Sequence, residues 1–528
     1  MSFSPRERAL AATVSGVLCA ALGVCVGYLC ALLVDRGAAP LHAVGSAVID
    51  GAPASMREWA ISTFGTADKP VLLMSIAAIM ALLAAVAGFA ELKRPPAGLV
   101  MFGVVGTVGI AAALDRPTAT WTWALPTLLG VAVAMIALHI LMGRIQPGIP
   151  SAATALTPQF DQSTDDSEAR GVAPEVERRQ FLVGASAVGG AVAVTGLGGW
   201  MLWRTTGSVG ADRAAFDLPS AANTVTTVAP DLDDVTPFIT PNKDFYRIDT
   251  ALTVPQVKSD SWSLRIHGMV DREIRIDLDQ LRRDHPAFDA VVTLTCVSNS
   301  VGGDLVGNAR WTGYRIRDLL ALAGPADDAD MVLSTSADGW TAGTPLTALT
   351  DNRDAMLAVG MNGQPLPVEH GYPVRMVVPG LYGYVSATKW VVSLEVTRFD
   401  RARAYWTTLG WAEKGPIKTS SRIDVPRPNS SVAPGPMTVG GVAWAQGRGI
   451  RGVQVRVDDG PWNDAEVLAP DLLDAWRLWK WDWDAQPGTH ELTVRSIDGD
   501  GQPQIEAQAP SVPDGATGLH TIAVSVAG

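Results

Sequence analysis

Cysteine and histidine are scarce in this sequence, which has 4 cysteines and 7 histidines among 528 residues. Three of the cysteines, Cys19, Cys25 and Cys30, fall within one apolar run, and only Cys296 lies outside it. The C-terminal part therefore has no cysteine pair for a disulfide, and its stability must come from a packed core. The spacing of the three clustered cysteines does not place them on one helix face, so we expect no metal site there.

Positive charge is also in deficit. Lys and Arg number 41 against 53 Asp and Glu, which gives a formal net charge of −12. This balance argues against attraction to a phosphodiester backbone, and we expect no nucleic acid partner. Charged residues make up only 18% of the chain and hydrophobic residues 48%, which is too apolar for a purely soluble protein.

Long, nearly uncharged runs account for that apolar content. Each has about the 20 residues that a helix needs to cross the hydrocarbon core of a bilayer. The five predicted spans are about residues 10–34, 70–90, 97–114, 121–143 and 181–203. The sequence therefore predicts a multi-pass protein of the cell membrane, with membrane lipid around its N-terminal part.

Basic residues between the spans predict the orientation. Arg6 and Arg8 precede the first span, Lys93 and Arg94 join the second to the third, and Arg144 follows the fourth. Basic residues gather in cytoplasmic loops, so the N-terminus is predicted to be cytoplasmic. The fifth span then leads outward, and everything after it is predicted to be extracytoplasmic.

The fifth span begins at a pair of arginines. Arg178 and Arg179 lie in Glu177-Arg-Arg-Gln-Phe-Leu-Val183, which resembles a twin-arginine signal, the address of proteins exported already folded. A protein loaded with a cofactor in the cytoplasm would need that route. Two arginines that merely flank an ordinary span are the alternative.

Composition and periodicity divide the chain into six parts. Mixed strand and helix patterns precede residue 425, whereas alternating strands such as Met437–Trp444 and His490–Arg495 follow it, as in an immunoglobulin-like sandwich. The predicted parts are 1–145 with four spans, an acidic and proline-containing cytoplasmic linker at 146–177, the fifth span at 178–204, a second linker at 205–235, an α+β domain at 236–424 and a β-sandwich at 425–528.

Cys296 ends the apolar strand Val291–Cys296 and opens a glycine-containing loop that runs to Gly303. A thiol in that position can point into a concave site, so Cys296 is the candidate metal ligand. A small buried core residue is the alternative. The loop continues through 304–313, and two further motifs follow at His370–Gly380 and Tyr384–Trp390.

Together these motifs resemble the sulfite oxidase family of molybdopterin-dependent oxidoreductases, over about residues 230 to 528. The resemblance implies a molybdenum-molybdopterin cofactor, one molybdenum per chain, with Cys296 as its protein thiolate. The pterin phosphate requires cations, for which Arg375 and Lys389 are suited. The predicted cofactor-binding residues are Asn242, Tyr246, Arg247, Asn308, Arg310, His370, Arg375, Thr388 and Lys389.

Arg247 is predicted to act in catalysis with Cys296, because its fixed charge would orient an anionic or oxygen-rich substrate. Simpler alternatives stay open at this point. Arg375 and Lys389 could be ordinary surface charges, His370 could cap a turn, and the segment 242–249 could be an edge strand.

The substrate is less well defined than the cofactor. The loop Val297–Val301 lacks the arginines that follow the ligand cysteine in animal and plant sulfite oxidases, and Trp340 replaces a family tyrosine. A small sulfur-containing substrate is expected, in either the sulfite-oxidising or the methionine-sulfoxide (S/N-oxide) reducing direction. A membrane-tethered binding protein without catalysis is the alternative from another class.

The predicted fold is multi-domain: an N-terminal α-helical transmembrane bundle, an α+β sulfite-oxidase-type molybdopterin domain and a C-terminal immunoglobulin-like β-sandwich. That sandwich resembles the family's dimerisation domain, and Trp479, Trp481 and Trp483 could form an aromatic interface of a homodimer or part of a core. His42 and His139 make a poor haem pair, so no haem is expected. Electrons would be exchanged with a separate quinone, cytochrome or membrane protein.

Overall fold

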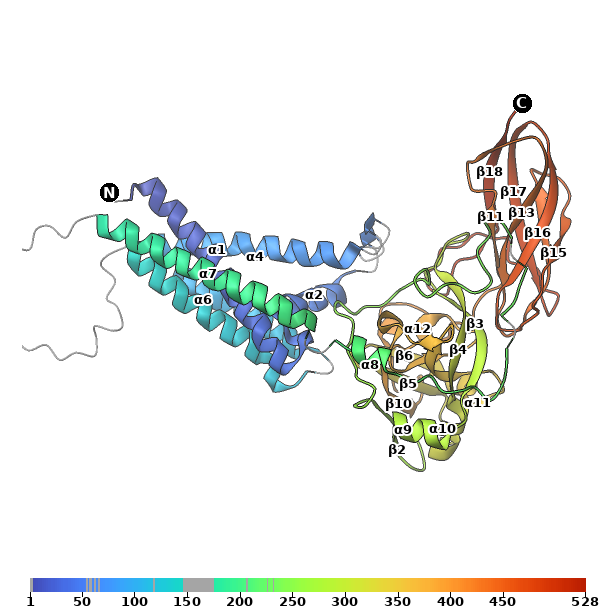
Figure 1. The fold of residues 1–528 in the computed structure, drawn as a ribbon, viewed down its shortest axis with the longest axis horizontal. Helices are drawn as coiled ribbons and strands as arrows, with labels where there is room; N and C mark the ends of the chain where they lie inside the picture. The colour runs from blue at the N-terminus through green and yellow to red at the C-terminus, as the bar shows by residue number, and fades with distance from the viewer. Residues whose placement is uncertain are drawn as a thin grey trace, which may run out of the picture. The chain divides into compact units, whose positions relative to one another are not determined.

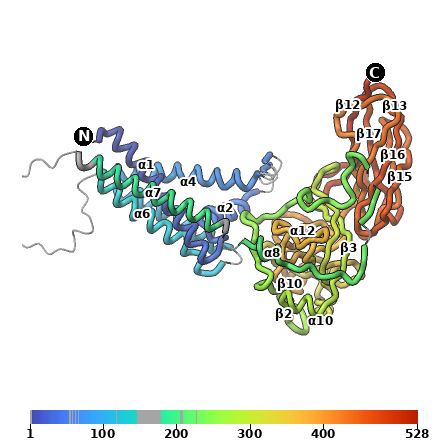
Figure 2. Tube along the Cα trace, viewed as in Figure 1, coloured from blue at the N-terminus to red at the C-terminus, as the bar shows by residue number. Residues whose placement is uncertain are grey.

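The computed structural model of the chain describes residues 3–53, 56, 59–60, 63–64, 67–116, 119–145, 175–205, 208–225, 227–230 and 232–528. Residues 146–174, most of the first predicted linker, lie outside the described residues. The chain divides into a first unit, Met1–Ser208 with Thr250–Thr253, and a second unit, Val209–Asp249 with Val254–Gly528. Figure 1 and Figure 2 trace both along the chain.

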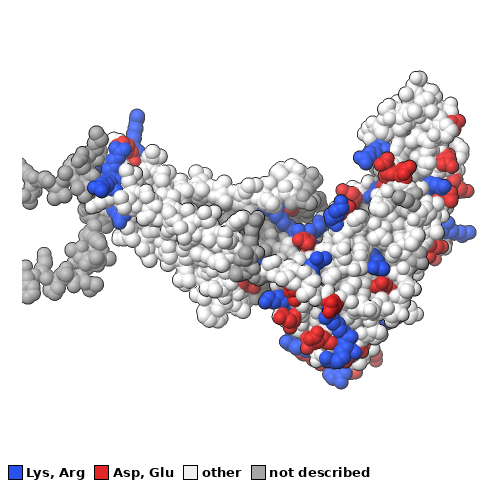
Figure 3. Space-filling view, viewed as in Figure 1, with Lys and Arg blue, Asp and Glu red and all other residues white. Residues whose placement is uncertain are grey.

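The first unit consists of helices, and five of them are long and apolar enough to cross a membrane, as predicted. A shorter helix, α2, occupies the predicted first outer loop. The elements are α1 (Pro5–Val34), η1 (Arg36–Ala38), α2 (Pro40–Gly51), α4 (Asp68–Lys93), α5 (Ala97–Leu114), η3 (Trp121–Trp123), α6 (Ala124–Ile145) and α7 (Glu175–Thr205). The face of this bundle that Figure 3 shows carries almost no charged atoms along its length, whereas Lys and Arg gather at its N-terminal end.

Side chains satisfy the backbone at two helix starts of this unit. Ser4 and Glu7 form a reciprocal capping box at the beginning of α1. Glu91 near the end of α4 is buried, and its Oε2 accepts the backbone N–H groups of Gly98 (2.8 Å) and Leu99 (3.1 Å) at the start of α5. A buried carboxylate at a helix N-terminus is well placed, because it meets free donors and the positive end of the helix dipole.

Glycines let α1 approach its neighbours closely. A Cβ at Gly16 would clash with the backbone carbonyl of Ala84 on α4, and a Cβ at Gly130 on α6 would clash with the backbone of Gly23. Small residues at helix crossings are the main source of close packing in membranes, where burial of apolar surface gives little driving force. The bundle is therefore held by backbone-to-backbone fit around α1.

The second unit begins with two sheets, the first mixed and the second antiparallel. One sheet has the order β2-β1-β10-β5-β6, in which β1 (Ser263–Gly268) and β10 (Val391–Thr397) are parallel. The other has the order β3-β4-β7-β8, with β9 paired to β7. The remaining bounds are β2 (Ile274–Asp277), β3 (Phe288–Thr295), β4 (Val306–Arg315), β5 (Met331–Ser336), β6 (Thr341–Pro345), β7 (Met356–Met361), β8 (Gln364–Pro365) and β9 (Arg375–Val377).

Short helices connect these strands, which matches the predicted α+β pattern. They are α8 (Gly210–Ala214), α9 (Leu278–Asp284), α10 (Ile316–Ala323), α11 (Leu346–Thr350), η5 (Val368–His370), α12 (Gly383–Ser386) and α13 (Tyr405–Thr408). α10 shows why the sequence folds this way: Ile316, Leu319, Leu320 and Ala323 recur at helical spacing and are all buried. Gly324 then ends the helix in a left-handed conformation.

Eight strands after residue 419 form one continuous ladder in the order β11-β13-β16-β15-β14-β17-β18-β12. Their bounds are β11 (Ser420–Val425), β12 (Ser431–Val432), β13 (Gly435–Trp444), β14 (Ile450–Val457), β15 (Asn463–Val467), β16 (Arg477–Ala485), β17 (Gly488–Asp498) and β18 (His520–Val526). Trp479 and Trp483 are buried in the core of this part. These two tryptophans are therefore part of a core and do not form the aromatic interface that was the other possibility.

Besides its own core, the C-terminal part contributes side chains to the core of the preceding domain. Trp444 and Trp476 from the C-terminal strands belong to the same buried cluster as the strands of the preceding domain. The predicted second linker also differs from expectation, since Val209, Phe216 and Val235 are buried in that cluster. Apolar residues spaced through the segment explain this packing.

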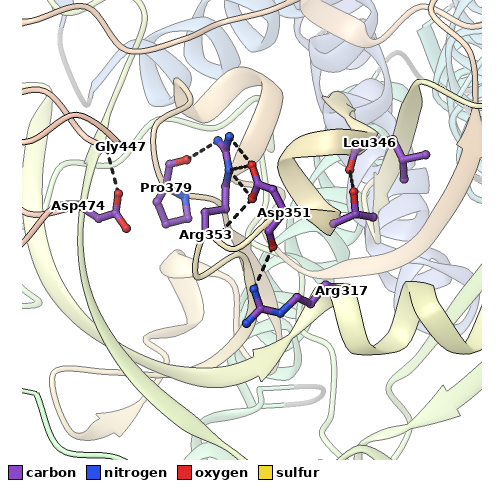
Figure 4. Close-up of polar contacts among 8 residues, drawn as sticks. Arg317, Leu346, Asp351, Arg353, Pro379, Gly447 and Asp474 are labelled. Atoms are coloured by element: carbon purple, nitrogen blue, oxygen red, sulfur yellow. Dashed lines mark hydrogen bonds and ion pairs between the residues drawn. The ribbon is translucent and has the colours of Figure 1, made fainter. Parts of the chain in front are cut away.

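A polar network lies near this shared core (Figure 4). The guanidinium of Arg353 donates to the Asp351 carboxylate (Nη2–Oδ2, 2.8 Å) and to the carbonyl of Pro379 (3.0 Å). Asp474 accepts the N–H of Gly447 at 3.1 Å. Burial raises the pKa of Asp474 to about 6, the Gly447 amide opposes the rise, and the carboxylate of Asp354 adds to it.

We expect Gly16→Leu to weaken the first unit, because α1 and α4 would have to separate to admit the side chain. Overpacking of this kind costs about 1–3 kcal/mol. Thermal unfolding of the full chain in nanodiscs should show a lower Tm. Gly103→Leu is the matched control, since a Cβ at Gly103 meets nothing within 4 Å. Equal losses in both variants would contradict the close packing.

We expect Asp474→Asn to stabilise the protein in a pH-dependent way. The pKa of Asp474 is raised in the folded state, so the free energy of unfolding is highest below about pH 4, where the carboxyl is protonated. It falls as the pH rises through about 6 and the buried carboxyl ionises. Asparagine keeps an acceptor for Gly447 but has no charge to bury. In urea unfolding, the difference in unfolding free energy between the variant and the wild-type protein should therefore increase by about 2 kcal/mol from pH 4 to pH 7. A constant difference across that range would contradict this account, and Asp500→Asn in an exposed turn is the control.

Candidate functional site

Cys296 follows the last residue of β3 and is partly exposed. Its N–H donates to the carbonyl of Leu305 (2.9 Å), and its carbonyl accepts the N–H of Asn299 (3.1 Å). The side chain of Asn299 in turn accepts the N–H of Leu305 (2.9 Å), which closes the loop. Burial raises the pKa of the thiol, and hydrogen bonding with Ser298 acts in the opposite direction. A rigid turn thus fixes a thiol that is neutral unless a metal binds it.

Thr293, three residues before Cys296, anchors β3 from both sides. Its hydroxyl donates to Asn308 Oδ1 (2.9 Å) and accepts the N–H of Trp476 (2.7 Å). Its backbone N–H donates to the carbonyl of Asp474 (2.9 Å), and its carbonyl accepts Nε2 of Gln446 (2.8 Å). The C-terminal strands therefore hold the strand that presents the thiol.

Arg375 on β9 is a buried cation, 4% exposed. Its guanidinium donates to the backbone carbonyls of His370 (3.1 Å), Met376 (3.3 Å) and Ala387 (3.4 Å) and lies 5.0 Å from the ring centre of Trp311. No carboxylate in the described part of the chain forms an ion pair with it. Burial lowers its pKa to about 10. A buried, desolvated guanidinium of this kind favours an anionic ligand.

Lys389 adds a second buried cation. Its Nζ donates to Asp249 Oδ2 (2.8 Å) and to the carbonyl of Glu369 (3.1 Å). Burial lowers the pKa of Lys389 to about 8, although Asp249 acts to raise it. Arg247 contacts the same Asp249 oxygen at 2.8 Å, so one carboxylate faces two cations. Arg247, Lys389 and Arg375 together form a cation cluster, in which three positive charges face the single carboxylate of Asp249.

His370 lies at the centre of these cations. Burial, followed by the charges of Arg375 and Lys389, lowers its pKa to about 3, so the imidazole is neutral at pH 7. The next residue, Gly371, has φ +109°, and a Cβ there would crowd Arg375 and Lys389. Glycine at this turn lets the histidine approach both side chains closely.

Tyr246 connects the cation cluster to the thiol. Its ring stacks on Phe245, with ring centres 5.3 Å apart. Burial raises the pKa of the phenol, the nearby Cys296 adds to the rise, and Arg375 opposes it. The phenol is therefore a neutral hydrogen-bond donor near both groups.

The structure brings six predicted residues into one site: Cys296, Tyr246, Arg247, His370, Arg375 and Lys389. Thr388 adjoins it, but its hydroxyl pairs with that of Ser334 at 2.6 Å. Asn242 contacts Asn362, whose Nδ2 donates to its Oδ1 at 2.8 Å. The polar side-chain atoms of Thr388 and Asn242 are thus bonded to Ser334 and Asn362, and their role in cofactor binding stays a prediction.

Asn308 and Arg310 are not brought into the site by their contacts. Both lie on β4, where Asn308 donates to the carbonyl of Phe238 (2.7 Å) and Arg310 faces Asp289 (3.8 Å). The site face of β4 is formed by the alternate residues instead, because Gly307 packs against Phe245 and Trp311 lies under Arg375. Their role as cofactor ligands stays a prediction.

Sequence reasoning missed two members of the site, Asp249 and Trp311. Asp249 lies two residues after Arg247, so in an extended segment both side chains share a face, and this spacing was a usable signal. Trp311 lies in the loop motif 304–313, but it contacts Arg375 through its ring and not through a polar group. A search for polar ligands in that motif therefore points to the neighbouring Arg310.

Comparison with known proteins identifies the family. The family described as "Oxidoreductase molybdopterin binding domain" matches residues 251–406. Sulfite oxidase of Gallus gallus is 29% identical over 322 residues, covering 52% of this chain and 69% of that protein. The mitochondrial sulfite oxidase of Homo sapiens is 30% identical over 321 residues, covering 52% of this chain and 58% of that protein.

Two bacterial proteins also match. The "Uncharacterized oxidoreductase YuiH" of Bacillus subtilis is 30% identical over 154 residues, which cover 29% of this chain and 74% of that protein. The crystal structure of the sulfane dehydrogenase SoxCD from Paracoccus pantotrophus covers 55% of this chain and 81% of that one, with 23% identity and a TM-score of 0.48. The chain belongs to the sulfite oxidase family of molybdopterin-dependent oxidoreductases. The predicted resemblance is thus confirmed, and an oxidoreductase is the class it defines.

The residues present fit a molybdenum-molybdopterin cofactor. The thiol of Cys296 is a soft ligand of the kind that binds molybdenum beside a dithiolene. The buried guanidinium of Arg375, with no described carboxylate to neutralise it, fits the terminal phosphate. Lys389 and the neutral His370 would complete that phosphate site.

We expect Arg375→Met to reduce cofactor content without weakening the cofactor-free fold. Burying this cation costs up to about 3 kcal/mol, judged from its lowered pKa, so an apolar side chain should leave the unfolding free energy equal or higher. Molybdenum per chain, measured by mass spectrometry, should fall at least tenfold. Arg213→Met is the matched control, because the guanidinium of Arg213 also donates to backbone carbonyls, those of Leu366 (2.7 Å) and Pro365 (2.8 Å), and this variant should retain the metal. Loss of both metal and stability in Arg375→Met would make the residue structural.

Proposed function

We propose that this protein is a membrane-anchored, extracytoplasmic molybdenum-molybdopterin oxidoreductase of the sulfite oxidase type. It would move an oxygen atom to or from a small sulfur-containing substrate and exchange electrons with a separate carrier. One observation supports this most: Cys296, whose backbone is fixed by hydrogen bonds, and Arg375, a buried cation without a described carboxylate partner, both lie near Tyr246. Family membership favours this enzyme over a tethered binding protein without catalysis.

Different residues of the site would bind the metal, the pterin phosphate and the substrate. Cys296 would bind the metal, while Arg375, Lys389 and His370 would hold the phosphate of the pterin. When bound, the molybdenum centre supplies the two-electron oxygen-atom chemistry. Tyr246 stays protonated because its pKa is raised, and it would donate a hydrogen bond to an oxygen of the substrate.

Arg247 is the cation of the cluster best placed to meet a substrate, since 36% of its side chain is exposed, against 11% for Lys389. Its bond to Asp249 fixes its direction without burying it. A guanidinium in this position would orient an anionic or oxygen-rich substrate. Oxidation of sulfite would take an oxygen from water and release two protons and two electrons.

Reduction of a sulfoxide, such as methionine sulfoxide, is the second candidate. The loop 297–301 after Cys296 has no arginine, and the pKa of the thiol is set by burial and by Ser298. A neutral sulfoxide would need no cation beside the metal ligand. This direction would consume two protons and two electrons and release water.

The membrane part completes the proposal. The basic residues at the N-terminal end of the bundle support a cytoplasmic N-terminus, and the arginine pair at the start of α7 supports twin-arginine export. Residues after α7 would then lie outside the cytoplasm. The eight C-terminal strands would form an immunoglobulin-like sandwich, and the protein would be a homodimer.

The test is turnover of full-length, molybdenum-loaded protein with two substrates. Sulfite would be assayed with ferricyanide as acceptor, and methionine sulfoxide with reduced benzyl viologen as donor. One substrate should turn over, and Cys296→Ala should abolish that activity. No turnover of either substrate by protein with one molybdenum per chain would overturn the proposal.

Arg247→Gln tests the role of the exposed cation. If the substrate is an anion, KM should rise about tenfold or more, because a charge-assisted hydrogen bond is lost, while molybdenum content stays unchanged. Arg265→Gln, which removes an exposed ion pair with Glu273 on β1, should leave KM unchanged. An unchanged KM for sulfite in Arg247→Gln would exclude this residue from substrate binding.

A further inference from the structure

A cavity lies within the helices of the first unit. Its volume is about 750 Å³, including the space at its opening. Residues of α1, α2, α4, α5 and α6 line it, among them Val24, Leu83, Phe102, Val105 and Val131. Its walls are apolar except at one residue, Thr127.

Thr127 is the unusual group of this cavity. It is only 5% exposed, and its hydroxyl has no hydrogen-bond partner among the described residues. Other hydroxyls in the same helices donate to the carbonyl four residues earlier, as Thr13, Ser15, Ser75, Thr107 and Thr195 do at 2.6–2.9 Å. An unpaired hydroxyl inside an apolar bundle is costly. A bound molecule with an acceptor would remove that cost.

The chemistry of the cavity defines its ligand. The ligand needs a large apolar surface and an oxygen acceptor that reaches Thr127 from inside the bundle. The acyl chains of a phospholipid supply the first, but their ester carbonyls are attached to a charged headgroup, which finds no polar partner inside an apolar cavity. An isoprenoid quinone supplies both, because a ring carbonyl can accept the hydroxyl proton while the isoprenoid chain lies along the apolar walls.

The position of Thr127 also suits a quinone. It lies in the first turn of α6, directly after η3, whose Trp121 is 76% exposed. Exposed tryptophans mark the interface between bilayer and water. A quinone ring at this depth would be close to water, from which its oxygens take protons when they are reduced.

We propose that this cavity binds an isoprenoid quinone, with Thr127 donating to a ring carbonyl. The inference rests on the proposed function, because it names the electron carrier of that reaction. Oxidation of sulfite with one water would yield sulfate, and its two electrons and two protons would convert the quinone to the quinol. In the reducing direction the quinol would supply the same electrons and protons.

The experiment measures binding, not turnover. The full chain in phosphatidylcholine nanodiscs would be exposed to an azido-ubiquinone photoprobe, and labelled peptides would be mapped by mass spectrometry. Label should concentrate on α5, α6 and α1, and unlabelled ubiquinone should compete it away. Thr127→Val should weaken competition about tenfold, whereas Thr107→Val, whose hydroxyl is paired with Gly103, should not.

A second pair of variants guards against altered folding. Val105→Phe would fill the cavity and should abolish saturable labelling, whereas Val104→Phe on the exposed face of the same helix, 59% exposed, should leave it intact. Labelling that is equal in both variants, or a cavity in which mass spectrometry finds only phospholipid, would overturn the inference.

Molybdenum-free Cys296→Ala protein separates this inference from the proposed function. Quinone binding should persist there although turnover is lost. Saturable binding without turnover of any sulfur substrate by loaded native protein would overturn the function alone. Turnover with artificial electron carriers but no saturable quinone binding would overturn the quinone site alone.

Discussion

The buried guanidinium of Arg375 imposes the main constraint on the second unit. A cation that is 4% exposed and has only carbonyl oxygens and an indole ring as described partners is tolerated when the surroundings favour it. The lowered pKa values of Lys389 and His370 follow from the same burial and the same charge. The site therefore concentrates positive charge that an anionic ligand would neutralise, as the phosphate of a pterin cofactor would.

The first unit is stabilised differently. In a bilayer, apolar side chains gain little by leaving lipid, so α1 packs on α4 and α6 through glycines at which the backbones touch. Close fit at those crossings contrasts with the open volume that α5 and α6 help to enclose.

The sequence predicted best what is local. The five apolar helices could be predicted because each meets its length and hydropathy requirement alone. Cys296, Arg375 and Lys389 could be selected because each lies in one of the ordered motifs, and the structure places them near one another. Their roles as cofactor ligands stay predictions. Asn308 and Arg310 illustrate the limit: a motif gives position along β4, but only the register of the sheet decides which face meets the site. The buried residues of 209–235 required tertiary packing to be known.

The hydrogen bonds of Thr293 have a consequence for modularity. Because Trp476, Gln446 and Asp474 form hydrogen bonds with Thr293 on the strand that precedes Cys296, the loops of the C-terminal part support the candidate metal ligand, and this part is not an appended module. A sequence boundary near residue 425 therefore does not mark a place where the chain can be divided. Recombination between relatives would have to exchange both halves together to preserve the geometry of the ligand strand.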